Sequence, residues 1–146
     1  MASTQHFTID RSFTGDAGEL LAREADAARW AEWASVPMRS FRWAQSPPPD
    51  LGEGAVRRLA AGPIAIVERT VSYVPGESHT YSMDPLATVR NYLATLTVRP
   101  NDGGGGELTW SVSFDTVDPV SGPLLRLAMR RTIAQLADRL VASTEG

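Results

Sequence analysis

The sequence of 146 residues contains no cysteine and no lysine, and it has only two histidines. Without cysteine the chain cannot form disulfides, thiolate metal sites or a thiolate nucleophile. His6 and His79 lie far apart in the sequence, and we expect both at the surface, with His79 beside a turn. No spacing of His, Asp and Glu resembles a metal site, and a Ser-His-Asp triad is not indicated. We therefore expect no metal and no cofactor.

Long apolar runs and an excess of positive charge are missing as well. No window approaches the ~18 apolar residues of a transmembrane helix. The first residues also lack the basic segment and apolar run of a signal peptide, so we expect a cytoplasmic protein without integral membrane association. The formal net charge is −3, whereas a nucleic-acid surface needs a basic excess, so no nucleic-acid partner is expected. The glycines at 103–106 lack the lysine and following helix of a phosphate loop and predict a hairpin tip.

A long amphipathic segment occupies residues 122–143. Its apolar side chains recur at steps of three and four, which predicts a helix of about twenty residues, roughly 30 Å long. Ser121 is the expected N-cap. The recurring residues are Leu125, Met129, Thr132, Ile133, Leu136 and Leu140. Arg126, Arg130 and Arg131 fall mostly outside this stripe and predict a solvated face, with contact to a lipid surface as the alternative.

Most of the remaining chain alternates between apolar and polar residues, which is typical of strands. The alternation predicts strands at 7–13, 38–45, 52–61, 64–73, 78–83, 89–99 and 107–117. Residues 19–34 are good helix formers and predict one or two short helices between the first two strands. Short turns require antiparallel pairing. The predicted fold is α+β: a seven-stranded curved antiparallel sheet wrapped around the C-terminal helix, in a single domain spanning 1–146.

The third and fourth predicted strands meet at a turn containing Gly62-Pro63. A two-residue hairpin places Leu59 opposite Ile66 and Arg57 opposite Glu68, with both pairs on one face. The apolar pair indicates that this face is the inner one. Arg57 and Glu68 then form a charged pair at a cavity wall. A register slip of one residue would instead put both in solvent, as a surface pair worth at most ~1 kcal/mol.

Aromatic residues on neighbouring strands point to the same interior. Trp110 and Phe114 fit either a core or an apolar wall, whereas a buried Tyr92 needs a partner for its hydroxyl, and Glu68 is a candidate. On the long helix, Leu125, Met129 and Ile133 face the same space. Trp33, Phe41 and Trp43 form either a lid or the deep end of that space.

The order of these elements, together with four short motifs, resembles the START-like superfamily, also called SRPBCC or helix-grip. Within it, the chain is similar to the bacterial polyketide cyclase/dehydrase group over roughly its whole length. The motifs are Gly52-Glu53-Gly54-Ala55-Val56-Arg57, Glu68-Arg69, Asn91-Tyr92 and Leu108-Thr109-Trp110. The resemblance implies a deep cavity between sheet and long helix that holds an apolar or amphipathic small molecule, such as a lipid or a polyketide.

One further segment, Ala61-Gly62-Pro63-Ile64-Ala65, resembles the gate loop of plant abscisic acid receptors, which share this fold. In those receptors the glutamate and tyrosine in the positions of Glu68 and Tyr92 face the hormone. The lysine and arginine that meet the hormone's acid group are not evident here. Hormone binding is therefore not implied.

Three functions remain open from the sequence. The first is small-molecule binding by Arg57, Leu59, Ile66, Glu68, Tyr92, Trp110, Phe114, Leu125, Met129 and Ile133. The second is a polyketide cyclase/dehydratase-type enzyme, in which Arg57 polarises a carbonyl, Glu68 moves a proton and Tyr92 positions an enol. The third is a partner-binding regulatory or toxin-like module with a collapsed cavity. A homodimer is neither indicated nor excluded.

Overall fold

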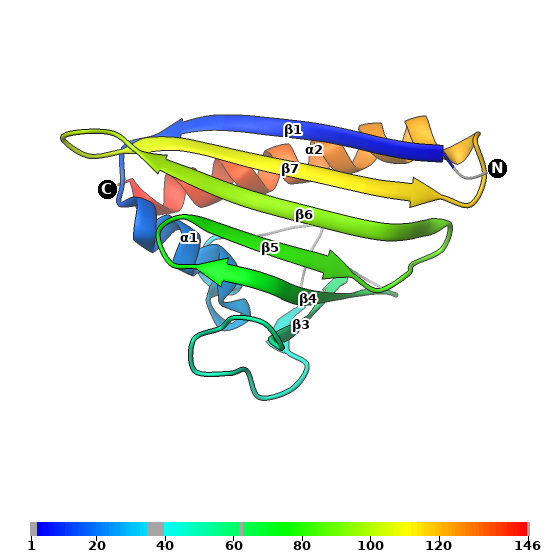
Figure 1. Cartoon of the computed structure of the whole chain (residues 1–146), viewed down its shortest axis with the longest axis horizontal. Coiled ribbons are helices and arrows are strands. Elements are labelled where there is room, and N and C mark those ends of the chain that lie inside the picture. Colours follow the sequence, from blue (N-terminus) through cyan, green and yellow to red (C-terminus); the bar gives the residue numbers. More distant parts are fainter. Residues whose placement is uncertain (1–2, 35–39, 62, 146) are drawn as a thin grey trace.

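The computed structural model describes residues 3–34, 40–61 and 63–145. Seven strands form one antiparallel sheet in the order β1-β7-β6-β5-β4-β3-β2. The strands are β1 (Ser3–Phe13), β2 (Ser40–Trp43), β3 (Val56–Ala61), β4 (Ile64–Val74), β5 (Ser78–Met83), β6 (Val89–Pro100) and β7 (Gly106–Thr116). The helices are α1 (Ala17–Ala25), the 3₁₀ helix η1 (Ala27–Glu32) and α2 (Ser121–Thr144). Figure 1 shows the curved sheet with α2 along one face and α1 near the C-terminal end of α2, which is the predicted α+β helix-grip arrangement.

The first helical region is divided in two by Asp26. The Asp16 carboxylate accepts a hydrogen bond from the Glu19 amide at 2.8 Å and so begins α1. The Asp26 carboxylate accepts from the Ala28 amide at 3.0 Å and begins η1. Both are N-caps of the ordinary kind, in which a side-chain oxygen satisfies an orphan amide. The two caps explain why two short helices form instead of one.

Several predicted boundaries were wrong, and β1 begins at Ser3 instead of residue 7. Ser121 does not cap α2 but is its first residue, because the Asp118 carboxylate accepts the amides of Val120 and Ser121 at 2.9 and 2.7 Å. The third strand begins at Val56 instead of residue 52, because Leu51 and Gly54 adopt positive φ angles of 56° and 98° and turn the chain there. Residues 38 and 39 of the predicted second strand lie outside the described residues, as does Gly62 of the turn and gate loop.

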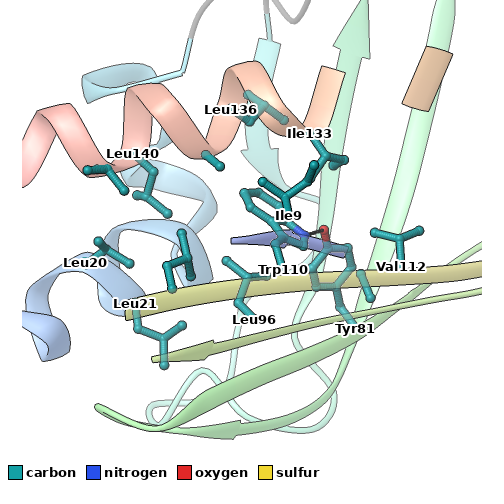
Figure 2. Packing of buried hydrophobic residues seen from close by; sticks show 14 of the residues in the cluster. Ile9, Leu20, Leu21, Tyr81, Leu96, Trp110, Val112, Ile133, Leu136 and Leu140 are labelled. Atoms are coloured by element: carbon teal, nitrogen blue, oxygen red, sulfur yellow. Dashed lines mark hydrogen bonds between the residues drawn. The ribbon is translucent and has the colours of Figure 1, made fainter. Parts of the chain in front are cut away.

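Only the C-terminal half of α2 is deeply buried. Ile133, Leu136 and Leu140 point from the helix toward Trp110 and Leu96 on the sheet, as Figure 2 shows. The N-terminal half of the same helix is much more open, with Leu124 and Leu127 exposed to 71% and 63%. The helix therefore covers the sheet tightly at one end and loosely at the other.

A β-bulge in β6 sets which residues of that strand face inward. The register with β7 shifts between Arg90 and Leu93, and Asn91 adopts a left-handed φ of 54°. Asparagine tolerates this conformation better than most residues, and its side-chain amide also donates to Asp115 Oδ2 at 2.9 Å. Strict alternation from the buried Val89 would send Tyr92 outward. The extra residue turns Tyr92 into the interior instead, where it is buried.

Candidate functional site

A pocket of about 280 Å³ lies between α2, η1 and the inner face of strands β3 to β6. Most of its lining is apolar, and Glu68 is the one charged residue among the described residues that line it. Ile64 and Ala128 are exposed and mark the side at which the pocket meets solvent. The lining residues are Trp30, Leu59, Ile64, Ile66, Glu68, Tyr81, Met83, Leu86, Tyr92, Ala128, Met129, Thr132, Ile133 and Leu136.

Arg57 and Glu68 pair across the β3–β4 hairpin in the predicted register. Arg57 Nε donates to Glu68 Oε1 at 2.8 Å, and the two residues are only 2% and 6% exposed. The predicted pairing and its inward orientation are therefore confirmed. A buried pair of this kind is costly to desolvate, so its further contacts decide whether it is tolerated.

Those further contacts enclose the Arg57 guanidinium completely. One terminal nitrogen donates to Glu24 Oε2 at 2.8 Å and the other to the Glu24 backbone carbonyl. The rings of Trp30 and Tyr81 each lie 4.7 Å from its central carbon, which is cation–π geometry. Arg57 thus sits behind Glu68 and is not part of the pocket lining.

Glu24 and His79 complete a buried polar cluster that the sequence did not predict. His79 Nδ1 lies 2.6 Å from Glu24 Oε1, and its Nε2 lies 3.0 Å from the Thr70 hydroxyl. The expectation that His79 is a surface residue was wrong, because its side chain is 0% exposed beneath α1, while His6 is exposed. His79 alternates with Tyr81 on the inner face of β5. Glu24 lies one helical turn after the buried Leu20, and both spacings are readable in the sequence.

The two carboxylates of this cluster have pKa values displaced in opposite directions. Burial acts to raise the pKa of Glu24, but the charges of His79 and Arg57 outweigh burial and leave that pKa below its usual value. Burial also raises the pKa of Glu68, and here Arg57 does not compensate fully, so the net pKa is raised. When the pKa values of two neighbouring carboxylates diverge, one stays ionised while the other can take up and release a proton. Glu68, which faces the pocket, is the one able to gain a proton nearer neutral pH.

A second polar chain runs through the aromatic residues of β5 to β7. Trp110 Nε1 donates to the Tyr81 hydroxyl at 3.3 Å (Figure 2). An indole N–H can only donate, so the Tyr81 oxygen is the acceptor in this bond, and the Tyr92 hydroxyl is a second hydrogen-bond neighbour of Tyr81. Burial raises the pKa of both tyrosines, so both are hydrogen-bond donors at neutral pH. The partner of Tyr92 is Tyr81 and not Glu68, the candidate named from the sequence.

The structure separates the residues predicted for the site into two groups. Six of the ten line the pocket: Leu59, Ile66, Glu68, Tyr92, Met129 and Ile133. Trp110 and Phe114 are fully buried in the core behind it, and Leu125 packs against the core without reaching the lining. Trp30, Tyr81 and Leu136 also line the pocket and were not predicted.

The aromatic residues near η1 form one cluster. Trp30 lies 4.7 Å from Trp33 and 5.7 Å from Phe41, measured between ring centroids. The indole nitrogens of Trp30 and Trp33 donate to the carbonyls of Glu24 and Arg23 at 2.7 and 3.1 Å. The cluster fixes η1 against the sheet, and through Trp30 it forms one wall of the pocket, while Trp33, Phe41 and Trp43 do not line it.

The described parts of the chain contain neither a membrane-spanning helix nor a metal-binding group. Across residues 3–34, 40–61 and 63–145, no helix is both long and apolar enough to span a membrane. The same residues contain no group of three or more His, Asp or Glu arranged to hold a metal ion.

Comparison with known proteins places the chain in a family. Residues 4–145 match the model of the family described as polyketide cyclase / dehydrase and lipid transport. No curated protein gives a significant match. A solved structure from Bacillus thuringiensis is similar with 19% identity, a TM-score of 0.75, and coverage of 96% of this chain and 98% of that one.

Two further proteins of known structure share the same architecture. Truncated norcoclaurine synthase from Thalictrum flavum aligns with a TM-score of 0.76 and 12% identity, over 96% of this chain and 92% of that one. Ara h 8.0201 aligns with a TM-score of 0.73 and 13% identity, over 97% and 98%. At such identities these similarities establish the fold alone. With the family match over nearly its full length, the chain belongs to the polyketide cyclase / dehydrase and lipid transport family and has the START-like helix-grip fold.

Proposed function

We propose that the pocket binds an apolar or amphipathic small molecule whose polar group is held by Glu68 and Tyr92. The observation that carries this proposal is the state of the Glu68 carboxylate. One oxygen is bonded to Arg57, and no described residue donates to the other, although the side chain is only 6% exposed and lines the pocket. A buried acceptor without a partner costs about 1–3 kcal/mol. A ligand that donates to this oxygen recovers that energy.

The size of the pocket limits the ligand. A volume of about 280 Å³ lies just below the ~300–1,000 Å³ that small-molecule sites usually occupy. A ligand of one or two rings fits this space better than a long acyl chain. The volume also argues against a collapsed interior, and hence against the partner-binding module as the main function.

Binding is tested with a neutral two-ring fluorescent probe, 6-propionyl-2-(dimethylamino)naphthalene, and a pocket-filling variant. Met129 is half-buried in the lining, so Met129→Trp adds bulk to the pocket. The matched control is Leu127→Trp, two residues away on the exposed side of α2. We expect Met129→Trp to weaken probe binding at least about tenfold and the control to leave it unchanged. Equal binding by the two variants, with unchanged melting temperatures, would place the probe elsewhere and contradict the proposal.

A second candidate function, catalysis by Glu68, is favoured by one observation. Its raised pKa, in a pocket that also holds the Tyr92 hydroxyl, suits a general acid or base. The carbonyl-polarising role suggested for Arg57 does not fit, because Arg57 is buried outside the pocket lining and its three nitrogens donate to Glu68 and Glu24. Glu68→Gln separates the two functions on a candidate polyketide: loss of turnover with intact binding supports the enzyme, and equal loss of both supports simple binding.

A further inference from the structure

The charges around the pocket are unbalanced, and this imbalance bears on what the pocket accepts. Glu24 and Glu68 are two carboxylates against the single guanidinium of Arg57. With His79 neutral, the cluster carries one excess negative charge. With His79 protonated, the charges of the cluster are balanced. The added positive charge then lies beside Glu24 and not on the side of Glu68 that faces the pocket. In both states Glu68 is the charge that a ligand meets.

No cation among the residues that the structure describes offsets this charge on the pocket side. Arg57 is 2% exposed, donates to Glu68 and twice to Glu24, and lies between the rings of Trp30 and Tyr81. It cannot turn toward a ligand anion without breaking all of these contacts. Among the described lining residues no arginine or histidine is present. A carboxylate in the pocket would therefore meet Glu68 without a counter-ion.

We propose that the pocket selects ligands by charge: it favours a protonated amine over a neutral alcohol of the same shape and rejects the corresponding carboxylate. This inference rests on the proposed function, since it assumes that the pocket binds a ligand at all. An ammonium group forms a charge-assisted hydrogen bond to the open oxygen of Glu68, which is about twice as strong as a neutral one. A hydroxyl group forms the neutral version of the same bond. A carboxylate can form neither and is repelled.

The test uses three naphthalene probes that differ in one group: naphthalen-2-ylmethanamine, naphthalen-2-ylmethanol and 2-naphthoic acid. Their dissociation constants are measured by calorimetry near neutral pH for the wild type and for Glu68→Gln. In the wild type we expect the amine to bind about tenfold more tightly than the alcohol, and the acid about tenfold more weakly than the alcohol. In Glu68→Gln the amine falls to the affinity of the alcohol. An acid that binds as tightly as the amine, or an amine preference that survives Glu68→Gln, overturns the inference.

A pH series on the wild type gives the same answer without relying on a variant. The groups that act on the Glu68 carboxyl are Arg57, Glu24, His79 and the phenols of Tyr81 and Tyr92. Lowering the pH from about 8 to about 5 moves Glu68 toward its neutral form, because its pKa is raised. The ratio of alcohol to amine dissociation constants is expected to fall over this range. A constant ratio, or a fall that persists unchanged in Glu68→Gln, overturns the inference.

The two proposals fail in different ways. If the wild type binds none of the three probes, or if Met129→Trp binds them as well as the wild type, the pocket is not a ligand site and the proposed function is overturned. If all three bind equally and all are lost in Met129→Trp, the pocket binds ligands but does not sort them by charge. That outcome overturns the charge preference alone.

Discussion

Replacing Arg57 by methionine tests whether the buried cluster holds the pocket wall in place. The substitution keeps a long side chain between the rings of Trp30 and Tyr81 but removes the charge and three hydrogen bonds. Breaking a buried ion pair from one side costs about 3–5 kcal/mol. Loss of the cation–π contacts adds about 0.5–2 kcal/mol. The expected loss is therefore about 3.5–7 kcal/mol, a large part of the ~5–15 kcal/mol by which a domain is usually stable.

The assay is urea unfolding followed by tryptophan fluorescence, with Arg58→Met as the matched control. Arg58 is the next residue of β3, is partly exposed, and alternation sends its side chain to the opposite face of the sheet. A surface change of this kind stays within about 0.5 kcal/mol. If Arg57→Met loses less than about 1 kcal/mol, the cluster behaves like a surface pair and the reasoning is refuted.

The stability lost in Arg57→Met should also depend on pH, and it should become smaller in acid. The native pKa of Glu68 is raised, so the native state binds a proton more readily than the unfolded state, and stability falls as the pH rises through that pKa. Without Arg57 the pKa of Glu68 rises further. The stability difference between Arg57→Met and the wild type is therefore expected to shrink as the pH is lowered. A difference that grows in acid would mean that Glu68 is not the destabilised charge.

Two further substitutions test the parts that position the site. Asn91→Val places a β-branched residue at a left-handed φ of 54°, and we expect a loss of about 1–3 kcal/mol in urea unfolding and weaker probe binding through misdirection of Tyr92. Asn91→Gly should retain most of both, and equal stability of the valine and glycine variants would show that the bulge is unstrained. His79→Phe removes the partner of Glu24 Oε1 and should cost about 1–3 kcal/mol, whereas His6→Phe at the exposed histidine should stay within about 0.5 kcal/mol. If His79→Phe were more stable than the wild type, the buried hydrogen bonds of His79 would make no net contribution to the free energy of unfolding.

The elements and the hairpin register followed from local patterns. Alternation identifies the face of a strand, and a short turn fixes which residues oppose each other, so the pairing of Arg57 with Glu68 was readable from the sequence. The start of α2 was not readable in the same way. Ser121 was a good cap candidate, but the Asp118 carboxylate, three residues upstream, accepts the backbone amide of Ser121 itself. Local rules assign a face or a cap candidate but do not rank the acceptors.

The buried cluster was missed for a different reason. Glu24 and His79 are 55 residues apart, on α1 and β5, and meet only once α1 packs across the sheet. Each residue alone is ordinary: a glutamate on a short helix and a histidine next to a turn. Their spacing is compatible with inner faces, but we expected His79 at the surface, because the distance in sequence hid the fact that each satisfies the other. Arg57, which we expected to contact the ligand, instead donates its hydrogen bonds within this cluster.

The uneven burial of α2 bears on how a molecule would reach the pocket. Ala128, Met129 and Thr132 border the pocket at the point where the tightly packed half of the helix gives way to the open half. Segments with few buried apolar contacts open locally at a free-energy cost well below that of global unfolding. Fraying of the first turns of α2 would widen the side at which the pocket already meets solvent, while Leu136 and Leu140 hold the rest of the helix in place. The width of this opening would then depend on the stability of a few helical turns and not on that of the whole fold.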